Sequence, residues 1–136
     1  MKENKFSKDV VKQLKSQAAF DMNFHGHRMQ KSGWPDLQVI HRKWKGFLEL
    51  KCEKYEASSL QRIIAAKIEL RGVPIYVLRC VEVDPTGGHW DIGHPKYEFF
   101  LENFQGNVIK PFCDLGSLLD VLVGLKNEKE KNNESI

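Results

Sequence analysis

The pattern that most restricts the fold lies in residues 47–81, where a segment with the spacing of a helix stands between two apolar segments. Apolar and polar side chains alternate in Phe47–Cys52, with the two-residue period of a β-strand. The middle segment begins at Ser58 or Ser59, either of which is a typical helix N-cap, and Gly72 follows it. Its apolar stripe consists of Leu60, Ile63, Ile64 and Ile68. Val73–Val81 is again strongly apolar and is expected to form a strand. A connection through the helix would place this strand parallel to an earlier one.

The remaining patterns predict a single mixed α/β domain over residues 1–125. Apolar residues recur every four positions from Phe6 to Ala18, which predicts a first helix over about residues 3–20. The other expected elements are a short strand within residues 21–34, a strand at Leu37–His41, a turn at Arg42–Gly46, a turn at Asp84–Gly88, an edge strand at Tyr97–Leu101 and a helix at Leu115–Leu125 capped by Asp114. The predicted core is therefore helix, three strands, helix and strand in one mixed sheet, with a C-terminal extension and a flexible polar tail at residues 126–136.

Composition and charge exclude several classes of protein. The chain has 136 residues, of which 41% are hydrophobic and 29% charged, which is typical of a globular domain. No apolar run approaches the roughly 18 residues of a membrane span, and the first residues are too polar for a signal peptide. Three widely spaced cysteines indicate neither a disulfide framework nor a metal site. We therefore expect an intracellular, cytoplasmic protein with reduced thiols.

The net charge of +3 conceals an asymmetry. Residues 1–54 contain 12 Lys and Arg against 6 Asp and Glu, whereas residues 55–136 contain 9 against 12. A basic N-terminal half favours a polyanionic partner such as a nucleic acid.

Two carboxylates and a lysine form the pattern with the clearest chemistry. Glu49 and Lys51 share one face of the strand at Phe47–Cys52, and Asp36 begins the preceding strand. If the two strands form a hairpin, Asp36 and Glu49 meet near one end of the sheet. Two carboxylates about 4 Å apart repel by about 4 kcal/mol at an effective dielectric of about 20. A hard divalent ion such as Mg²⁺ relieves this repulsion, and Lys51 beside it is placed to orient or deprotonate an attacking water.

These residues resemble the PD-(D/E)xK nuclease signature. The fuller pattern is similar to the VRR-NUC branch of these restriction-endonuclease-like proteins, and in particular to its phage-type stand-alone members. It consists of Gly33-x-Pro35-Asp36-Leu37, then Phe47-Leu48-Glu49-Leu50-Lys51, then Ser58-x-x-Gln61 opening a helix that ends in Gly72, with His25-Gly26 upstream. The resemblance covers about residues 3–81.

The resemblance implies a divalent-metal-dependent endonuclease that hydrolyses DNA phosphodiester bonds by in-line attack of water. Asp36, Glu49 and the backbone carbonyl of Leu50 would bind Mg²⁺ or Mn²⁺. Lys51 would assist the water, and Gln61 would position Lys51 or a phosphate. Glu3 fits an additional acid on the first helix, with Asp9 as the competing candidate. Small members of the family resemble Holliday-junction resolvases and act as dimers, so the resemblance implies branched DNA and a second copy as partners.

Two basic segments are candidate DNA contacts. The first contains His25, Arg28 and Lys31, which could contact phosphate or simply belong to a loop. The second contains Arg42, Lys43, Trp44 and Lys45, and combines phosphate-binding cations with an aromatic ring that could stack on a base. The structural alternative for the second segment is a solvated turn with Trp44 packed locally.

The sequence alone also allows simpler, non-catalytic roles for the motif residues. Asp36 could be a turn carboxylate, Glu49 and Lys51 an exposed ion pair on an edge strand, and Gln61 a solvated helix residue. The alternative functions are a nicking or restriction-type nuclease on duplex DNA, and a catalytically silent DNA-binding or assembly module with the same fold.

Overall fold

The computed structural model describes residues 2–23, 33–83 and 96–134. One six-stranded sheet with strand order β1-β2-β3-β4-β5-β6 forms its centre, and three α-helices and a short 3₁₀ helix surround it. The elements are α1 Glu3–Ser16, β1 Phe20–Asn23, β2 Leu37–Ile40, β3 Lys45–Cys52, α2 Ser59–Glu69, β4 Ile75–Glu82, β5 Tyr97–Glu102, β6 Val108–Phe112, η1 Leu115–Ser117 and α3 Leu118–Glu134. Among the described residues, no helix is both long and apolar enough to cross a membrane.

The sheet pairing confirms the predicted mixed α/β core. β1, β2 and β3 are antiparallel neighbours, whereas β3 and β4 are parallel and are joined through α2. This order of helix, three strands, helix and strand is the one that the resemblance to restriction-endonuclease-like nucleases implies. β5 and β6 then extend the sheet as antiparallel strands.

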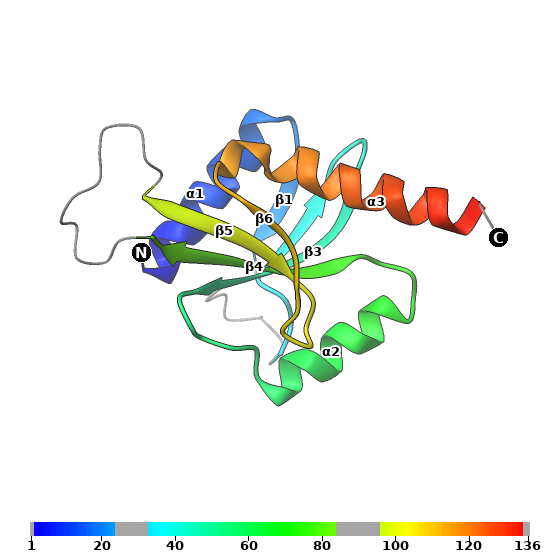
Figure 1. Cartoon of the computed structure of the whole chain (residues 1–136), viewed down its shortest axis with the longest axis horizontal. Coiled ribbons are helices and arrows are strands. Elements are labelled where there is room, and N and C mark those ends of the chain that lie inside the picture. Colours follow the sequence, from blue (N-terminus) through cyan, green and yellow to red (C-terminus); the bar gives the residue numbers. More distant parts are fainter. Residues whose placement is uncertain (1, 24–32, 84–95, 135–136) are drawn as a thin grey trace.

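Helices cover the two faces of the sheet unequally. α1 and α3 lie on one side and α2 on the other (Figure 1). The larger core lies under α1 and α3, where Phe6 and Leu122 pack on Leu50 and Leu78. The smaller core lies under α2, where Ala65 and Ile68 meet Ile75 and Val77. Strand alternation therefore sends Glu49 and Lys51 to the α2 side, opposite Leu48 and Leu50.

The first helix ends earlier than its apolar period predicts. α1 stops at Ser16, because Ala18 adopts φ 62° and Ala19 N–H donates to Leu14 O at 3.0 Å. These contacts turn the chain directly into β1. Ala18 therefore continues the spacing of the apolar stripe without belonging to the helix.

The C-terminal region differs most from the sequence prediction. Tyr97–Leu101 is not an edge strand, because β6 pairs with the outer side of β5. β6 has no alternating pattern, since four of its five residues are exposed. The last helix runs to Glu134 rather than Leu125, so residues 126–134 of the expected tail are helical. Lys and Glu favour helices, and Lys126 and Glu130 pair one turn apart at 3.9 Å. The expected turn at Asp84–Gly88 lies outside the described residues.

Candidate active site

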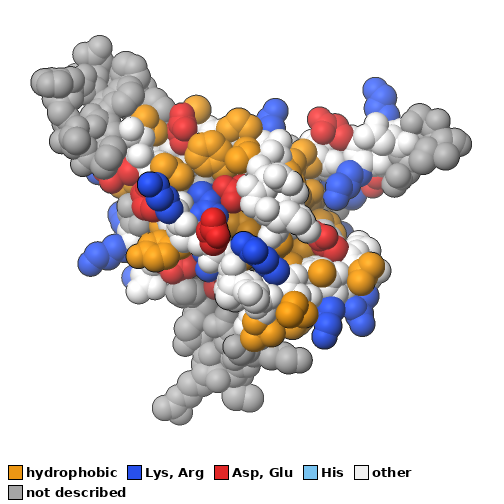
Figure 2. Space-filling model, turned by 60° about the horizontal axis from the view of Figure 1, so that its bottom comes forward, with side chains coloured by type: hydrophobic (Ala, Val, Ile, Leu, Met, Phe, Trp, Pro, Cys, Tyr) orange, Lys and Arg blue, Asp and Glu red, His pale blue; other side chains and the backbone are white. Residues whose placement is uncertain are grey.

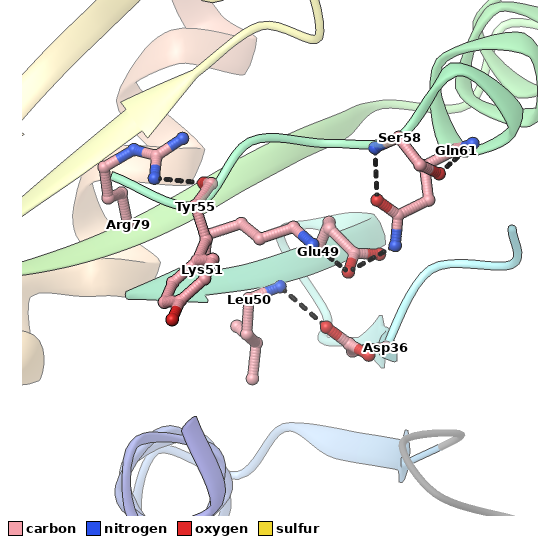
Figure 3. Close-up of polar contacts among 8 residues, drawn as sticks. All are labelled: Asp36, Glu49, Leu50, Lys51, Tyr55, Ser58, Gln61 and Arg79. Atoms are coloured by element: carbon pink, nitrogen blue, oxygen red, sulfur yellow. Dashed lines mark hydrogen bonds and ion pairs between the residues drawn. The ribbon is translucent and has the colours of Figure 1, made fainter. Parts of the chain in front are cut away.

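Asp36 reaches the site through the pairing of β2 with β3. Leu37 is the register partner of Leu48, so Asp36, one residue earlier, lies beside Glu49. The Asp36 side chain is 3% exposed, and the backbone N–H of Leu50 donates to its Oδ2 at 2.9 Å (Figure 3). A backbone donor holds the carboxylate in one orientation. Asp36 is thus part of the buried site rather than a solvated turn.

Glu49 and Lys51 lie on an interior strand, not at an edge, since β3 has β2 and β4 as neighbours. Glu49 is 2% exposed, and Lys51 Nζ lies 3.8 Å from its Oε1. The Lys51 side chain runs along the sheet toward the Glu49 carboxylate (Figure 3). Because Glu49 is buried and the Lys51 side chain is only 14% exposed, the two do not form a surface ion pair on an edge strand.

Gln61 serves the helix and the site together. Ser58 is the N-cap of α2, and its backbone N–H donates to Gln61 Oε1 at 2.8 Å while its hydroxyl accepts from Gln61 N–H. This capping box occupies the amide oxygen of Gln61 and so turns its NH₂ group outward from the cap. That NH₂ group donates to Glu49 Oε1 at 3.1 Å. Gln61 therefore contacts Glu49, whereas the resemblance implies Lys51 or a phosphate.

Gly33 explains how the segment before Asp36 comes close to α2. It adopts φ +80°, and a Cβ at this position would lie 2.6 Å from Leu60 Cγ. Only glycine tolerates both the backbone conformation and the contact. The glycine of the sequence motif thus lets the chain pass close to the first turn of α2 just before it reaches Asp36.

The two carboxyl groups make the site electrostatically unusual. Burial, and then the negative charge and hydrogen bonding of Asp36, raise the pKa of Glu49 to about 9, while Lys51 opposes the change. Glu49 Oε2 is buried and has no hydrogen-bond partner among the described residues. A buried carboxylate pair in this state requires a proton or a cation.

A divalent cation fits this donor set. The groups available are hard oxygen donors, namely the two carboxyl groups and the backbone carbonyl of Leu50. The described residues contain no cluster of three or more His, Cys, Asp and Glu side chains suited to a metal. Mg²⁺ typically uses one or two carboxylates and keeps several waters, so the pair alone is a sufficient protein contribution.

Glu3 is better placed than Asp9 to serve as the additional acid. Glu3 begins α1 and lies near enough to Glu49 that its negative charge adds to the rise in the pKa of Glu49. Asp9 instead pairs with Lys5 on the same helix at 3.2 Å. A role for Glu3 in the site stays a prediction.

The basic turn between β2 and β3 is exposed, but its tryptophan is not. Arg42, Lys43 and Lys45 are exposed, whereas Trp44 is 1% exposed and belongs to the larger core. The prediction that Trp44 stacks on a base is therefore wrong. Its ring packs over Gly46, where a Cβ would lie 2.8 Å from the ring. The alternation of the sequence does not distinguish a buried from an exposed aromatic residue in a short turn.

Two further lysines approach this turn from the other end of the chain. Lys126 Nζ donates to Lys43 O at 3.3 Å, and Lys129 Nζ lies 5.9 Å from the centre of the Tyr76 ring. Together with Lys45, both lysines line a cleft of about 770 Å³ that also contains Glu69 and Glu130. These lysines are not among the contacts predicted from the sequence, because residues 126–136 have the composition of a flexible polar tail. The other predicted contacts, His25, Arg28 and Lys31, lie outside the described residues.

Basic side chains do not gather into one patch on the face that Figure 2 shows. There, Lys and Arg are interspersed with acidic and hydrophobic side chains. The excess of positive charge in the N-terminal half of the sequence is thus not visible as a single surface on this side of the described molecule.

Comparison with known proteins finds similarity among solved structures. The chain matches no protein-family model and no curated protein sequence. Among solved structures, it is similar to Hjc, a Holliday junction resolvase from the archaeal hyperthermophile Archaeoglobus fulgidus. The TM-score is 0.49 at 15% sequence identity, over 85% of this chain and 92% of the other. These values assign no family to the chain, so membership of the VRR-NUC branch stays a prediction from the motifs.

Proposed function

We propose that this protein is a divalent-metal-dependent endonuclease that hydrolyses DNA phosphodiester bonds, with branched DNA as its preferred substrate. One observation carries the proposal: Asp36 and Glu49 lie side by side in a buried site, with Lys51 and Gln61 both directed at Glu49. Burying two carboxyl groups costs stability unless a ligand or a proton compensates, so their pairing favours a functional site over a structural one.

The protein side chains have distinct tasks in this reaction. Asp36 and Glu49 would hold Mg²⁺ or Mn²⁺, with the carbonyl of Leu50. The ion supplies Lewis acidity, which stabilises negative charge on the phosphoryl oxygens. The Leu50 N–H fixes Asp36, and Gln61 fixes Glu49. Lys51 would orient or deprotonate the attacking water. In-line attack leaves a 5′-phosphate and a 3′-hydroxyl.

DNA phosphates would contact the exposed turn between β2 and β3. Arg42, Lys43 and Lys45 supply three cations there, and Lys126 and Lys129 extend this surface from α3. Lys45 lies on the same face of β3 as Glu49, four residues away, which is about 13 Å along a strand. A duplex arm can bridge that distance. We further propose a homodimer, because paired cuts in a branched substrate need two sites related by a two-fold axis.

A cleavage assay tests the proposal directly. Wild-type protein is incubated with a four-way junction and with linear duplex of matched sequence, in Mg²⁺, Mn²⁺ or EDTA. We expect metal-dependent cleavage that is faster on the junction and absent in Glu49→Gln. Glu98→Gln, which changes an exposed glutamate on β5, serves as the matched control and should cleave normally.

Each other result selects a different function. Equal rates on both substrates would support a restriction-type or nicking nuclease. Salt-dependent DNA binding with no cleavage in any metal, and no Mg²⁺ or Mn²⁺ binding by calorimetry, would support the catalytically silent module. Full activity in Glu49→Gln would contradict the proposed site.

A further inference from the structure

Arg79 is a largely buried charged residue in the interior of the sheet, and two of its contacts are to the segment that follows β3. It lies on β4 as the register partner of Lys51. Its Nε and Nη2 donate to the two carboxylate oxygens of Glu102 on β5, at 2.7 and 3.1 Å. Its remaining terminal nitrogen, Nη1, donates to the backbone carbonyl oxygen of Glu53 at 2.8 Å and to that of Tyr55 (Figure 3). The guanidinium thus joins two strands to the segment that follows β3.

That segment, residues 53–57, connects the two halves of the site. It begins directly after β3, which carries Glu49 and Lys51, and it leads into Ser58, the N-cap of α2. Glu53 adopts φ 54°, a left-handed conformation that a non-glycine residue holds only when its surroundings impose it. Two hydrogen bonds hold Glu53 in this conformation. Arg79 donates to its backbone carbonyl oxygen, and the Glu82 N–H donates to its Oε1 at 3.1 Å.

The position of Ser58 determines where the Gln61 amide points. The Ser58 N–H occupies Gln61 Oε1, and only then does Gln61 direct its NH₂ group to Glu49 Oε1. Any shift of residues 53–57 would move Ser58 and hence this donor. The contacts therefore form a continuous chain from Glu102 through Arg79, the 53–57 segment and Ser58 to Gln61 and Glu49.

We infer that Arg79, held by Glu102, is a positioning residue that fixes the 53–57 segment so that Gln61 orients Glu49. This inference rests on the proposed nuclease function for its kinetic consequence but not for its structural one. Arg79 itself does not contact DNA: its side chain is 13% exposed and its donors are occupied by protein oxygens. The adjacent cavity of about 390 Å³ is lined by three acidic residues, Glu53, Glu56 and Glu102, as well as by Lys54 and Arg62.

The experiment removes the guanidinium without leaving a buried charge unpaired. The double variant Arg79→Met/Glu102→Met replaces both members of the ion pair with apolar side chains, a change that buried pairs often tolerate. Arg79→Lys is the second variant, because lysine keeps the charge but lacks the planar guanidinium that makes four hydrogen bonds here, two of them to one carboxylate. The control is Arg62→Gln, which removes an exposed guanidinium that pairs with Glu56 of the same segment at 3.7 Å.

Two measurements separate positioning from stability. The first is the NMR signal of the Gln61 side-chain NH₂ in metal-free, DNA-free protein, which reports its hydrogen bond to Glu49. The second is cleavage kinetics on the four-way junction, resolved into kcat and KM. We expect the Gln61 signals to move toward those of a free amide in both Arg79 variants. We also expect kcat to fall by about 10- to 100-fold, as for other groups that orient metal ligands, with KM unchanged. Arg62→Gln should change neither readout.

The outcomes are distinct. Unchanged Gln61 signals in a folded variant would overturn the inference, as would a fall in thermal stability with kcat preserved. If the double variant does not fold, Arg79→Lys decides by the same criteria. If the wild-type protein cleaves no DNA, the proposed function fails, and the NMR signals alone still decide whether Arg79 positions Gln61.

Discussion

The Gln61 amide donates to Glu49 Oε1 at 3.1 Å, so the first turn of α2 is hydrogen-bonded to the carboxyl group in the middle of β3. The Gln61 side chain therefore takes part both in the cap of α2 and in a hydrogen bond to Glu49, a proposed metal ligand. Substitutions at Gln61 can separate the two roles, because the cap uses the amide oxygen and the site uses the NH₂ group.

Gln61→Glu should preserve the helix and impair the site. Glutamate completes a capping box as well as glutamine does, so we expect thermal stability within a few degrees of wild type. Its carboxylate replaces the donor to Glu49 with a third negative charge, which should lower kcat by about 10- to 100-fold. Gln61→Ala, in contrast, removes both interactions and should also destabilise the protein by about 1–2 kcal/mol. Equal loss of stability in both variants would argue against the separation of roles.

The stability of the metal-free protein should decrease as the pH rises from about 4.5 to about 9. The pKa of Glu49 is raised from 4.5 to about 9, so between these values the folded protein holds a proton that the unfolded chain releases. Proton uptake by the folded state means that each rise in pH favours unfolding. Urea denaturation across this range measures the effect. Glu49→Gln should show a flatter profile, and an identical pH profile in this variant would contradict the assignment to Glu49.

Substitution of Trp44 should affect stability and leave DNA affinity unchanged. Trp44→Leu leaves a cavity in the larger core and should cost roughly 2–5 kcal/mol. Gly46→Ala places a Cβ 2.5 Å from Pro74 O and 2.8 Å from the Trp44 ring, and should cost about 1–3 kcal/mol. Chemical denaturation gives these values, and fluorescence anisotropy at low temperature gives DNA affinity for the folded variants. A tenfold loss of affinity in folded Trp44→Leu would restore the stacking interpretation.

Lys126 and Lys129 should contribute to DNA affinity without contributing to chemistry. If each neutralises one phosphate, Lys126→Gln/Lys129→Gln should reduce the slope of log K against log salt by about 2, at 0.9 per phosphate. The single-turnover rate at saturating protein should not change. Lys8→Gln/Lys15→Gln, which alters two exposed lysines on α1, is the control. An unchanged slope would limit the proposed DNA surface to the turn between β2 and β3.

Local sequence patterns predicted how the candidate site residues are arranged, because most of that arrangement depends on residues close together in the sequence. Alternation in β3 assigned Glu49 and Lys51 to one face, and the spacing of Ser58 and Gln61 indicated the helix start. The hairpin brought Asp36 to Glu49 as its distance along the chain suggested. What the sequence did not reveal was which residue Gln61 contacts, because either Glu49 or Lys51 lay within its reach.

Contacts between distant residues account for what was missed. Arg79 meets Glu102 across two strands, and Lys126 meets Lys43 across most of the chain. The single arginine within the apolar run at Val73–Val81 was the available signal for the first contact, since a charge inside such a strand requires a partner. No comparable signal marked β6, whose exposed residues include Pro111 and Lys110 and which is held chiefly by its hydrogen bonds to β5.

The candidate site residues lie close together in the sequence, and this affects the order in which the site forms during synthesis and folding. Asp36, Glu49, Lys51 and Gln61 all precede β4 in the chain, so a ribosome has already synthesised them before it begins the strand that carries Arg79. The hairpin and helix can form early, because their contacts are short in sequence. The burial that makes Glu49 retain a proton comes later, when β4 pairs with β3 and α2 closes over it. The nascent chain thus passes through a stage in which the two carboxylates are already neighbours but are still hydrated and repel only weakly, and it buries them last.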